Sequence, residues 1–288
     1  MRIESNFITS SQDDFDLASL RSEKRPVVSG YDHIKVIDLF SGCGGLTVGA
    51  LQAAASLGLN IQVLLSCETS QIYNEIYKEN SSPIRTIERP IEEILSSFTG
   101  EALNAAELEL FKALGETDLL MGRPPCQGHS DLNNHTRRED PRNDLYFQMA
   151  RATEIFRPKW VIIENVLGVK HSKNQVVART LSQLQGFGYH TLNLSLNAAD
   201  FGVAQNRKRH FTVASRHSLD NFEFILTRLR VNKHRPVLWA IDDLKSSYCE
   251  TSIFNSSASH STTNRKRIDY LFRKRSTDPH YPSARHFA

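Results

Sequence analysis

From residue 34 onward, short apolar runs alternate with longer segments of helical spacing. The apolar runs have the length of buried strands, and they are Ile34–Phe40, Ile61–Cys67, Asp118–Gly122, Trp160–Ile163, Tyr189–Leu196 and His210–Ala214. The predicted helices between them are Leu46–Leu57, Thr69–Asn80, Asn143–Phe156 and Val176–Leu184. Strands that alternate with helices predict an α/β fold built on a doubly wound, mostly parallel sheet.

Both ends of the chain lack this pattern. We expect residues 1–30 to form a flexible extension, since they are polar and show no period. The pattern weakens again after Pro236, and the Ser/Thr-rich stretch Ser256–Asn264 predicts a loop. We therefore expect a main domain over residues 31–244 and a separate region over residues 245–288.

Size and composition narrow the class of protein. The chain has 288 residues, of which 40% are hydrophobic, so it can build a substantial core. No apolar run is long enough for a membrane span, and the first residues lack a signal-peptide core. The four cysteines show no paired spacing, which fits a reducing cytoplasm and argues against a disulfide framework or a zinc site.

The small net charge of +3 hides an uneven distribution. From Gln205 to the end, 16 Lys and Arg residues face 7 Asp and Glu residues, a net charge of +9. A basic region of this kind can bind a polyanion such as nucleic acid, or it can be an ordinary solvated surface. Charge alone leaves these two interpretations open.

A glycine-rich turn follows the first predicted strand. Glycines at the start of a helix let a ligand approach the backbone closely. Glu68 ends the second strand, where an acid commonly binds ribose hydroxyls. No complete G-x-G-x-x-G is present, so a nucleoside-like cofactor is favoured over a dinucleotide; the alternative is a tight turn without a ligand. The candidate cofactor residues are Asp38, Phe40, Ser41, Gly42, Cys43, Gly44, Gly45 and Glu68.

Three further clusters lie at predicted strand ends. Cys126 and Gln127 follow two prolines that stop a strand, so Cys126 is either an exposed nucleophile or a small buried hydrophobe. Glu164 and Asn165 follow another strand, where an acid can exchange a proton or merely begin a helix. Gln205–Arg209 offers arginine forks for carbonyl or phosphate oxygens, or is a surface turn.

The order of these motifs resembles that of a known family. Asp38–Gly45, Pro124–Gln127, Glu164–Val166 and the pattern Gln205-x-Arg207-x-Arg209 are similar to motifs of the S-adenosylmethionine-dependent DNA cytosine-5 methyltransferases. The resemblance covers residues 34–216 and extends to Val237–Leu244. It implies a Rossmann-like methyltransferase core that methylates cytosine at carbon 5.

The resemblance also implies a role for each matching residue. Cys126 would add to carbon 6 of cytosine, with Gln127 beside it. Glu164 would contact ring nitrogen 3 and the exocyclic amine, and Asn165 would shape the same strand end. Arg209 would hold the cytosine carbonyl and Arg207 would support the pocket.

The implied cofactor is S-adenosylmethionine and the implied substrate is double-stranded DNA. Phe40 and the glycines would line the cofactor site, with Glu68 on the ribose. The basic segment Gly128–Arg142 resembles the loop that closes over DNA once the target base has been flipped out. We expect a cytoplasmic monomer from a bacterial or phage modification system, with a restriction endonuclease acting on the same site.

The chain departs from the family pattern at three places. Arg123 stands where the family usually has glycine, and Pro90 stands where the family usually has an acid that contacts the adenine amine. The motifs that follow the family's recognition domain are missing. We therefore expect residues 245–288 to be the start of a truncated recognition region. We also expect the chain to be inactive, or to methylate without sequence preference. Two alternatives stay open: methylation of tRNA, and a remnant that binds DNA or cofactor without turnover.

Overall fold

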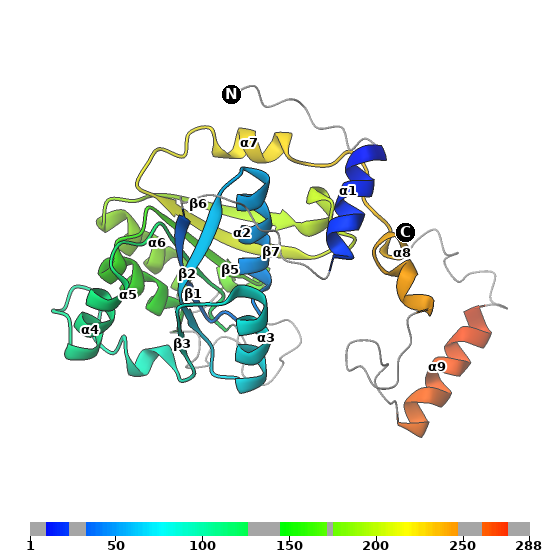
Figure 1. The fold of residues 1–288 in the computed structure, drawn as a ribbon, viewed down its shortest axis with the longest axis horizontal. Helices are drawn as coiled ribbons and strands as arrows, with labels where there is room; N and C mark the ends of the chain where they lie inside the picture. The colour runs from blue at the N-terminus through cyan, green and yellow to red at the C-terminus, as the bar shows by residue number, and fades with distance from the viewer. Residues whose placement is uncertain (1–9, 23–32, 126–144, 172–174, 247–260, 276–288) are drawn as a thin grey trace. The chain divides into compact units, whose positions relative to one another are not determined.

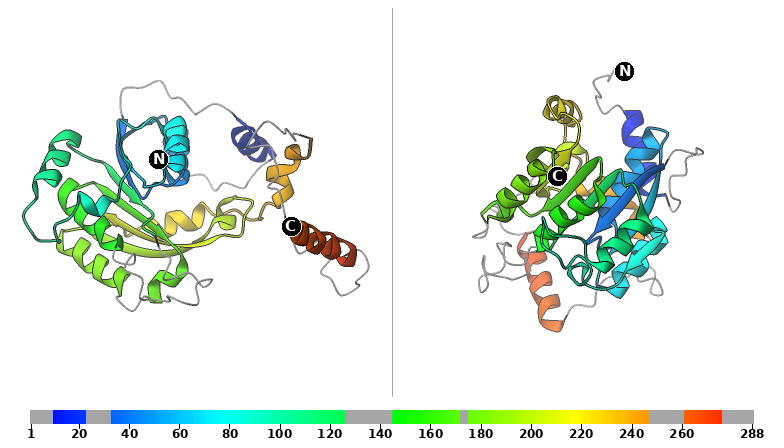
Figure 2. Two further views of the ribbon diagram at one scale, coloured as in Figure 1. Left: turned by 90° about the horizontal axis from the view of Figure 1, so that it is seen from below. Right: turned by 90° about the vertical axis from the view of Figure 1, so that its left-hand side faces the viewer.

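The structure is a computed structural model that describes residues 10–22, 33–125, 145–171, 175–246 and 261–275. The chain divides into two compact units. The core unit comprises residues 23–197 and 208–227, and the second unit comprises residues 1–22, 198–207 and 228–288. Figures 1 and 2 show the ribbon of both units. The predicted boundaries at residues 30 and 244 stay a prediction.

The core unit alternates strands and helices along the chain, as the apolar pattern predicts. Its elements are β1 (His33–Leu39), α2 (Gly45–Ser56), β2 (Asn60–Cys67), α3 (Gln71–Ser81), β3 (Arg85–Ile87), η1 (Ile91–Glu93), α4 (Ala105–Leu114), β4 (Leu119–Gly122), α5 (Tyr146–Phe156), β5 (Trp160–Asn165), η4 (Leu167–His171), α6 (Val176–Gly186), β6 (His190–Asn197), β7 (Lys208–Ser215) and α7 (Phe222–Arg228).

Within the described residues, one sheet of seven strands has the order β3-β2-β1-β4-β5-β7-β6. The first five strands in that order pair in parallel, while β7 runs antiparallel to both β5 and β6. The prediction of a mostly parallel α/β sheet is confirmed. The reversed direction of β7 is a finding that the apolar pattern could not supply, because strand direction leaves no trace in hydrophobicity.

Helices cover the sheet in two groups. Helices α2 and α3 pack on each other, and α5 contacts both α4 and α6 (Figures 1 and 2). Between these groups, Leu39, Leu65 and Leu120 of the central strands are fully buried. Burial of such side chains is the main favourable term in folding. Within the described residues, no helix is long and apolar enough to cross a membrane.

Several elements differ from the sequence expectation. Strand β3 and helix α4 fall in a stretch where no element was predicted. Asn104 begins α4 with a capping box: its side chain accepts from the backbone N–H of Glu107, and the Glu107 carboxylate accepts from the backbone N–H of Asn104. The predicted loop over Ser256–Asn264 is wrong from Thr262 onward, because α9 (Thr262–Arg275) begins there.

The second unit contains an N-terminal helix where an irregular extension was expected. Its described elements are α1 (Ser10–Leu20), η5 (Ala198–Phe201), α8 (Val237–Ile241), η6 (Asp242–Ser246) and α9. Arg235 explains why α1 forms: its guanidinium lies 2.7 Å from Asp13 Oδ1 and 2.6 Å from Asp16 Oδ2, and stacks on Trp239. Arg235 lies more than 200 residues from α1 in the sequence. A local sequence pattern could therefore not predict this contact.

A buried ion pair joins α4 and α5 in the core unit. Arg151 donates from Nη2 to Glu107 Oε2 at 2.7 Å and from Nε to Glu107 Oε1 at 3.0 Å. Both side chains are almost completely buried, with 3% and 0% exposure. Burial alone would raise the pKa of Glu107, but the hydrogen bonds from Arg151 and Asn104 hold that pKa below its usual value.

Replacement of Arg151 by methionine is expected to destabilise the fold by about 3–5 kcal/mol, because it leaves the Glu107 charge buried and unpaired. Chemical denaturation of the two proteins measures the difference. The double variant Arg151→Met/Glu107→Leu removes both charges and should recover much of the loss. A single variant as stable as the wild type would contradict this account of the pair.

Candidate functional site

The predicted site residues meet at the carboxyl ends of parallel strands. Leu39 of β1 pairs with Cys67 of β2 and with Gly122 of β4, and Gly122 pairs with Ile163 of β5. Residues that directly follow these strands therefore start from one edge of the sheet. Along the sheet, the chain order reverses between β1 and β4, and open α/β sheets bind ligands at such a switch point.

The glycine-rich turn follows β1 as the sequence predicts, and three of its residues have left-handed backbone. Phe40, Gly42 and Gly44 have φ angles of 54°, 54° and 87°, in the left-handed region. A Cβ on Gly44 would lie 2.9 Å from the Tyr77 ring, so a larger residue would not fit there. Cys43 is exposed and Gly45 begins α2, whose first N–H groups receive no side-chain cap. The start of α2 is therefore open to an anionic or polar ligand.

Glu68 holds this turn to the start of α3. Its carboxylate accepts from the backbone N–H groups of Gly42 at 3.0 Å, Thr69 at 2.8 Å and Ser70 at 3.0 Å. Ser41 adds a second tie, since its N–H donates to the Cys67 carbonyl at 3.0 Å. The predicted ribose-binding acid thus lies against the glycine turn, at the end of β2.

Asp38 is buried beneath the turn. Thr47 donates to its Oδ2 at 2.5 Å and Tyr77 donates to the same atom at 3.3 Å, while Oδ1 has no hydrogen-bond partner. Burial raises the pKa of Asp38 to about 6, although hydrogen bonds and Arg123 lower it. Asp38 therefore supports the turn from inside the protein, through Thr47 of α2 and Tyr77 of α3.

The proline turn after β4 is tied to the end of β5. Asn165 donates from Nδ2 to the Pro124 carbonyl at 3.3 Å, and its Oδ1 accepts from the N–H of Val166 at 2.8 Å. Pro124 and Asn165 are both buried. The chain is thus anchored two residues before Cys126; Cys126, Gln127 and the predicted loop Gly128–Arg142 lie outside the described residues.

Glu164 and Arg209 form an ion pair, with 3.0 Å between Arg209 Nε and Glu164 Oε1. Glu164 belongs to β5, so the helix-start interpretation of this acid is wrong. Arg209 is the second residue of β7, although the sequence predicts it before the strand. The two side chains are 15% and 25% exposed, so both keep a surface that a ligand can reach.

Arg207 belongs to the second unit and its side chain is exposed. Its carbonyl accepts from the N–H of Ala198 at 2.9 Å, which closes the segment between β6 and β7. The predicted pocket role of Arg207 stays a prediction.

Comparison with known proteins agrees with this arrangement of motifs. The sequence profile of the family described as C-5 cytosine-specific DNA methylase matches residues 34–284. The chain belongs to this family. The resemblance inferred from the motifs is thereby confirmed.

Two relatives of this methylase are bacterial Type II methyltransferases. M1.BsuMI of Bacillus subtilis is 37% identical over 259 residues, which is 90% of this chain and 60% of the relative. M.FnuDI of Fusobacterium nucleatum is 31% identical over 194 residues, which is 66% of this chain and 50% of the relative. The methylase chain thus spans half to three fifths of the length of these relatives.

A solved structure shares the fold. It is a protein described as a DNA modification methyltransferase encoded within an E. coli prophage, with a TM-score of 0.54 and 24% identity. The match covers 75% of this chain and 56% of that chain. The shared fold confirms the methyltransferase-like α/β architecture expected from the sequence.

The sequence reasoning did not assign a role to Arg123, Thr47 or Tyr77, although all three contact the glycine turn or Asp38. For Arg123 the sequence did contain an indication, because this arginine replaces the usual glycine of the methylase motif. For Thr47 and Tyr77 it contained none, because helical residues that face a turn look like ordinary core residues in a sequence.

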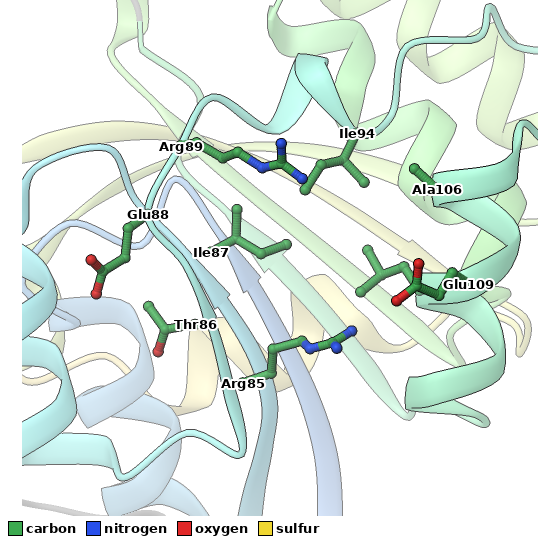
Figure 3. Close-up of a pocket in the computed structure, with 9 residues that line it drawn as sticks. Arg85, Thr86, Ile87, Glu88, Arg89, Ile94, Ala106 and Glu109 are labelled. Atoms are coloured by element: carbon green, nitrogen blue, oxygen red, sulfur yellow. The ribbon is translucent and has the colours of Figure 1, made fainter.

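Neither of the two cavities described in the methylase is lined by the glycine turn, Glu68, Glu164 or Arg209. A cavity of about 440 Å³ lies between β3, η1 and α4, with Arg85 and Arg89 at its rim (Figure 3). Glu88 also lines this cavity, and its carboxylate pairs with Lys78. A second cavity, of about 680 Å³, is lined by Asp118 and Lys159 at the amino ends of β4 and β5.

Proposed function

We propose that this methylase transfers a methyl group from S-adenosylmethionine to carbon 5 of cytosine in double-stranded DNA. The observation that carries the proposal is the meeting of two sites at one sheet edge. The glycine turn and Glu68 form the first, and the Glu164–Arg209 pair beside the anchored Pro124 turn forms the second. Methyl transfer requires a cofactor and a base to be held next to each other.

The first site has the features that a nucleoside cofactor with an amino-acid tail needs. The turn has left-handed backbone at Gly42 and Gly44, and α2 begins there without a side-chain cap. Glu68 at the end of β2 offers carboxylate oxygens to ribose hydroxyls. S-adenosylmethionine bound there would supply an electrophilic methyl group. Pro90 follows β3 at the place where the family pattern usually has an acid, so we expect weaker recognition of the adenine amine.

The second site would activate the base. Carbon 5 of cytosine is a poor nucleophile until a thiolate adds to carbon 6. In the proposed reaction the Cys126 thiolate forms a bond to carbon 6, carbon 5 takes the methyl group, and a base removes the carbon 5 proton. The electron pair of that C–H bond re-forms the ring double bond and expels Cys126.

Glu164 and Arg209 would hold the ring during this reaction. Glu164 contacts ring nitrogen 3 and the exocyclic amine, and it offsets the charge that develops as Cys126 adds. Arg209 donates to the cytosine carbonyl oxygen. Their ion pair supports these roles, because it fixes both groups next to each other before the base arrives.

Double-stranded DNA is the proposed substrate. A cytosine inside a duplex cannot reach a thiol, so it must rotate out of the helix. The net charge of +9 from Gln205 onward favours contact with phosphates. Phosphate contacts position a protein on DNA, whereas base contacts choose the sequence.

The test is transfer of labelled methyl groups from S-adenosylmethionine to mixed-sequence duplex DNA or to tRNA. We expect 5-methylcytosine in the nucleosides of the duplex, identified by mass spectrometry. Label in tRNA alone would replace the DNA assignment with the tRNA alternative. A protein that neither binds S-adenosylhomocysteine nor transfers label would contradict the proposed reaction.

A role in restriction and modification follows from the relatives, which are named Type II methyltransferases. In such a system an endonuclease cuts the same sequence when it is unmethylated. We propose a partner endonuclease of this kind. Bisulfite sequencing of a host that expresses the chain tests this role together with the predicted sequence-blind behaviour. One fully methylated short site would identify the shared sequence and contradict the prediction of an inactive or sequence-blind chain.

A further inference from the structure

Arg123 connects the two halves of the proposed site. Its backbone N–H donates to the Leu39 carbonyl at 3.2 Å, so it extends β4 beside β1. Its side chain then crosses the glycine turn, where Nη2 donates to the Ser41 carbonyl at 2.8 Å. A Cβ on Gly42 would lie 2.7 Å from Nη2. The guanidinium therefore lies directly over Gly42.

Most donors of this guanidinium are not used by the described residues. A guanidinium carries five N–H donors. Nη2 makes the contact with Ser41, whereas Nε is buried and has no hydrogen-bond partner. A buried donor without a partner is costly, so this guanidinium lacks part of the hydrogen bonding that a native site usually provides.

The nearby acids do not supply an acceptor for Nε. Asp38 Oδ2 accepts from Thr47 and Tyr77, Asp38 Oδ1 is buried and accepts no hydrogen bond from Arg123, and the Glu68 carboxylate accepts from backbone N–H groups. Among the ion pairs of the described residues, none includes Arg123. The charge of Arg123 lowers the pKa of the buried Asp38, but no ion pair joins the two side chains. Because Arg123 is partly exposed, its guanidinium can also meet an anion from outside the chain.

The start of α2 lies beside the same guanidinium. The Ser41 carbonyl that accepts from Arg123 also accepts from the N–H of Gly44, the residue before α2, at 3.0 Å. The twelve-residue helix has no side-chain cap, so its first N–H groups and its dipole also favour an anion. The Arg123 guanidinium and the uncapped N-terminus of α2 thus lie next to each other at the glycine turn.

We infer that Arg123 binds the carboxylate of the amino-acid part of S-adenosylmethionine, together with the first N–H groups of α2. This inference rests on the proposed cofactor. A carboxylate fits because its two oxygens can accept from the guanidinium and from the helix start at once. Arg123 thereby makes the protein selective for a methyl donor that carries the carboxylate.

The test compares S-adenosylmethionine with its decarboxylated form, which differs only by the carboxylate, in titration calorimetry. The wild type should bind S-adenosylmethionine about 10- to 100-fold more tightly, the range expected for charge-assisted hydrogen bonds. Arg123→Met should lose most of this preference and bind the decarboxylated ligand within about 2-fold of the wild type. Arg123→Lys keeps the charge and should retain part of the preference.

Arg85→Met is the matched control, because Arg85 is an exposed arginine at the start of β3, and both affinities should stay unchanged. Equal losses for the two ligands in Arg123→Met would overturn the inference and assign Arg123 to support of the turn. Equal affinity of the wild type for S-adenosylmethionine and its decarboxylated form would also overturn the inference. Binding of neither ligand by the wild type would overturn the proposed cofactor itself.

Discussion

Replacement of Cys126 by serine is expected to abolish the covalent complex between the methylase and duplex DNA that contains 5-fluorocytosine. After methyl transfer the fluorinated ring has no proton to lose at carbon 5, so the bond to Cys126 cannot break. Serine has the same shape but is a far weaker nucleophile at neutral pH, because little of it is ionised. Denaturing electrophoresis, with S-adenosylmethionine and the duplex present, measures the complex.

Cys249→Ser is the control for this experiment, since Cys249 lies outside the motifs of the methylase family. It should give the same amount of complex as the wild type. A complex that persists in Cys126→Ser would assign the nucleophile to another residue. Binding of S-adenosylhomocysteine should be unchanged in both variants, which separates loss of the nucleophile from loss of the fold.

The second large effect is expected at Glu164. Glu164→Gln keeps the size of the side chain but removes the charge that pairs with Arg209 and the capacity to exchange a proton. We expect methyl transfer to slow by about 10²- to 10⁴-fold, the usual range for a positioned acid or base. Single-turnover kinetics with saturating cofactor and duplex measures the chemical step directly.

Asp118→Asn is a matched control for the Glu164 variant. Asp118 is also an acid in an ion pair, 2.7 Å from Lys159, but it precedes β4 at the opposite edge of the sheet. Its variant should transfer methyl groups at the wild-type rate. Near-normal turnover in Glu164→Gln would instead give Glu164 a structural role at the end of β5.

The sequence predicts the central strands well because each is a buried apolar run with clear ends. Predictions for Ile34–Phe40 and Ile61–Cys67 match β1 and β2 within about one residue, and Trp160–Ile163 falls within β5. Parallel strands that are buried on both faces carry a strong signal. The motifs at their ends follow directly, because a strand end fixes where the next residue lies.

Other elements depend on partners that are distant in the sequence. Helix α1 is polar, and its acids are held by Arg235, so its own residues give little sign of a helix. The Glu164–Arg209 pair requires the antiparallel register of β5 and β7, in which Asn165 pairs with His210. Helix α4 is different, because the spacing of Asn104 and Glu107 is a local signal in the sequence for the start of a helix.

The hairpin of β6 and β7 extends the set of residues that evolution can use to tune catalysis. All eight residues of β6 pair with β7, and Leu196 is the residue opposite Arg209. A slip of β7 by one residue would turn Arg209 to the opposite face of the sheet, and the pairing with β6 helps to prevent this. Substitutions in β6 can thus alter how firmly Arg209 faces Glu164, although β6 carries no predicted catalytic residue. Mutational scans of the methylase should therefore find loss-of-activity positions on this outer strand, although none of its residues is proposed to contact the base.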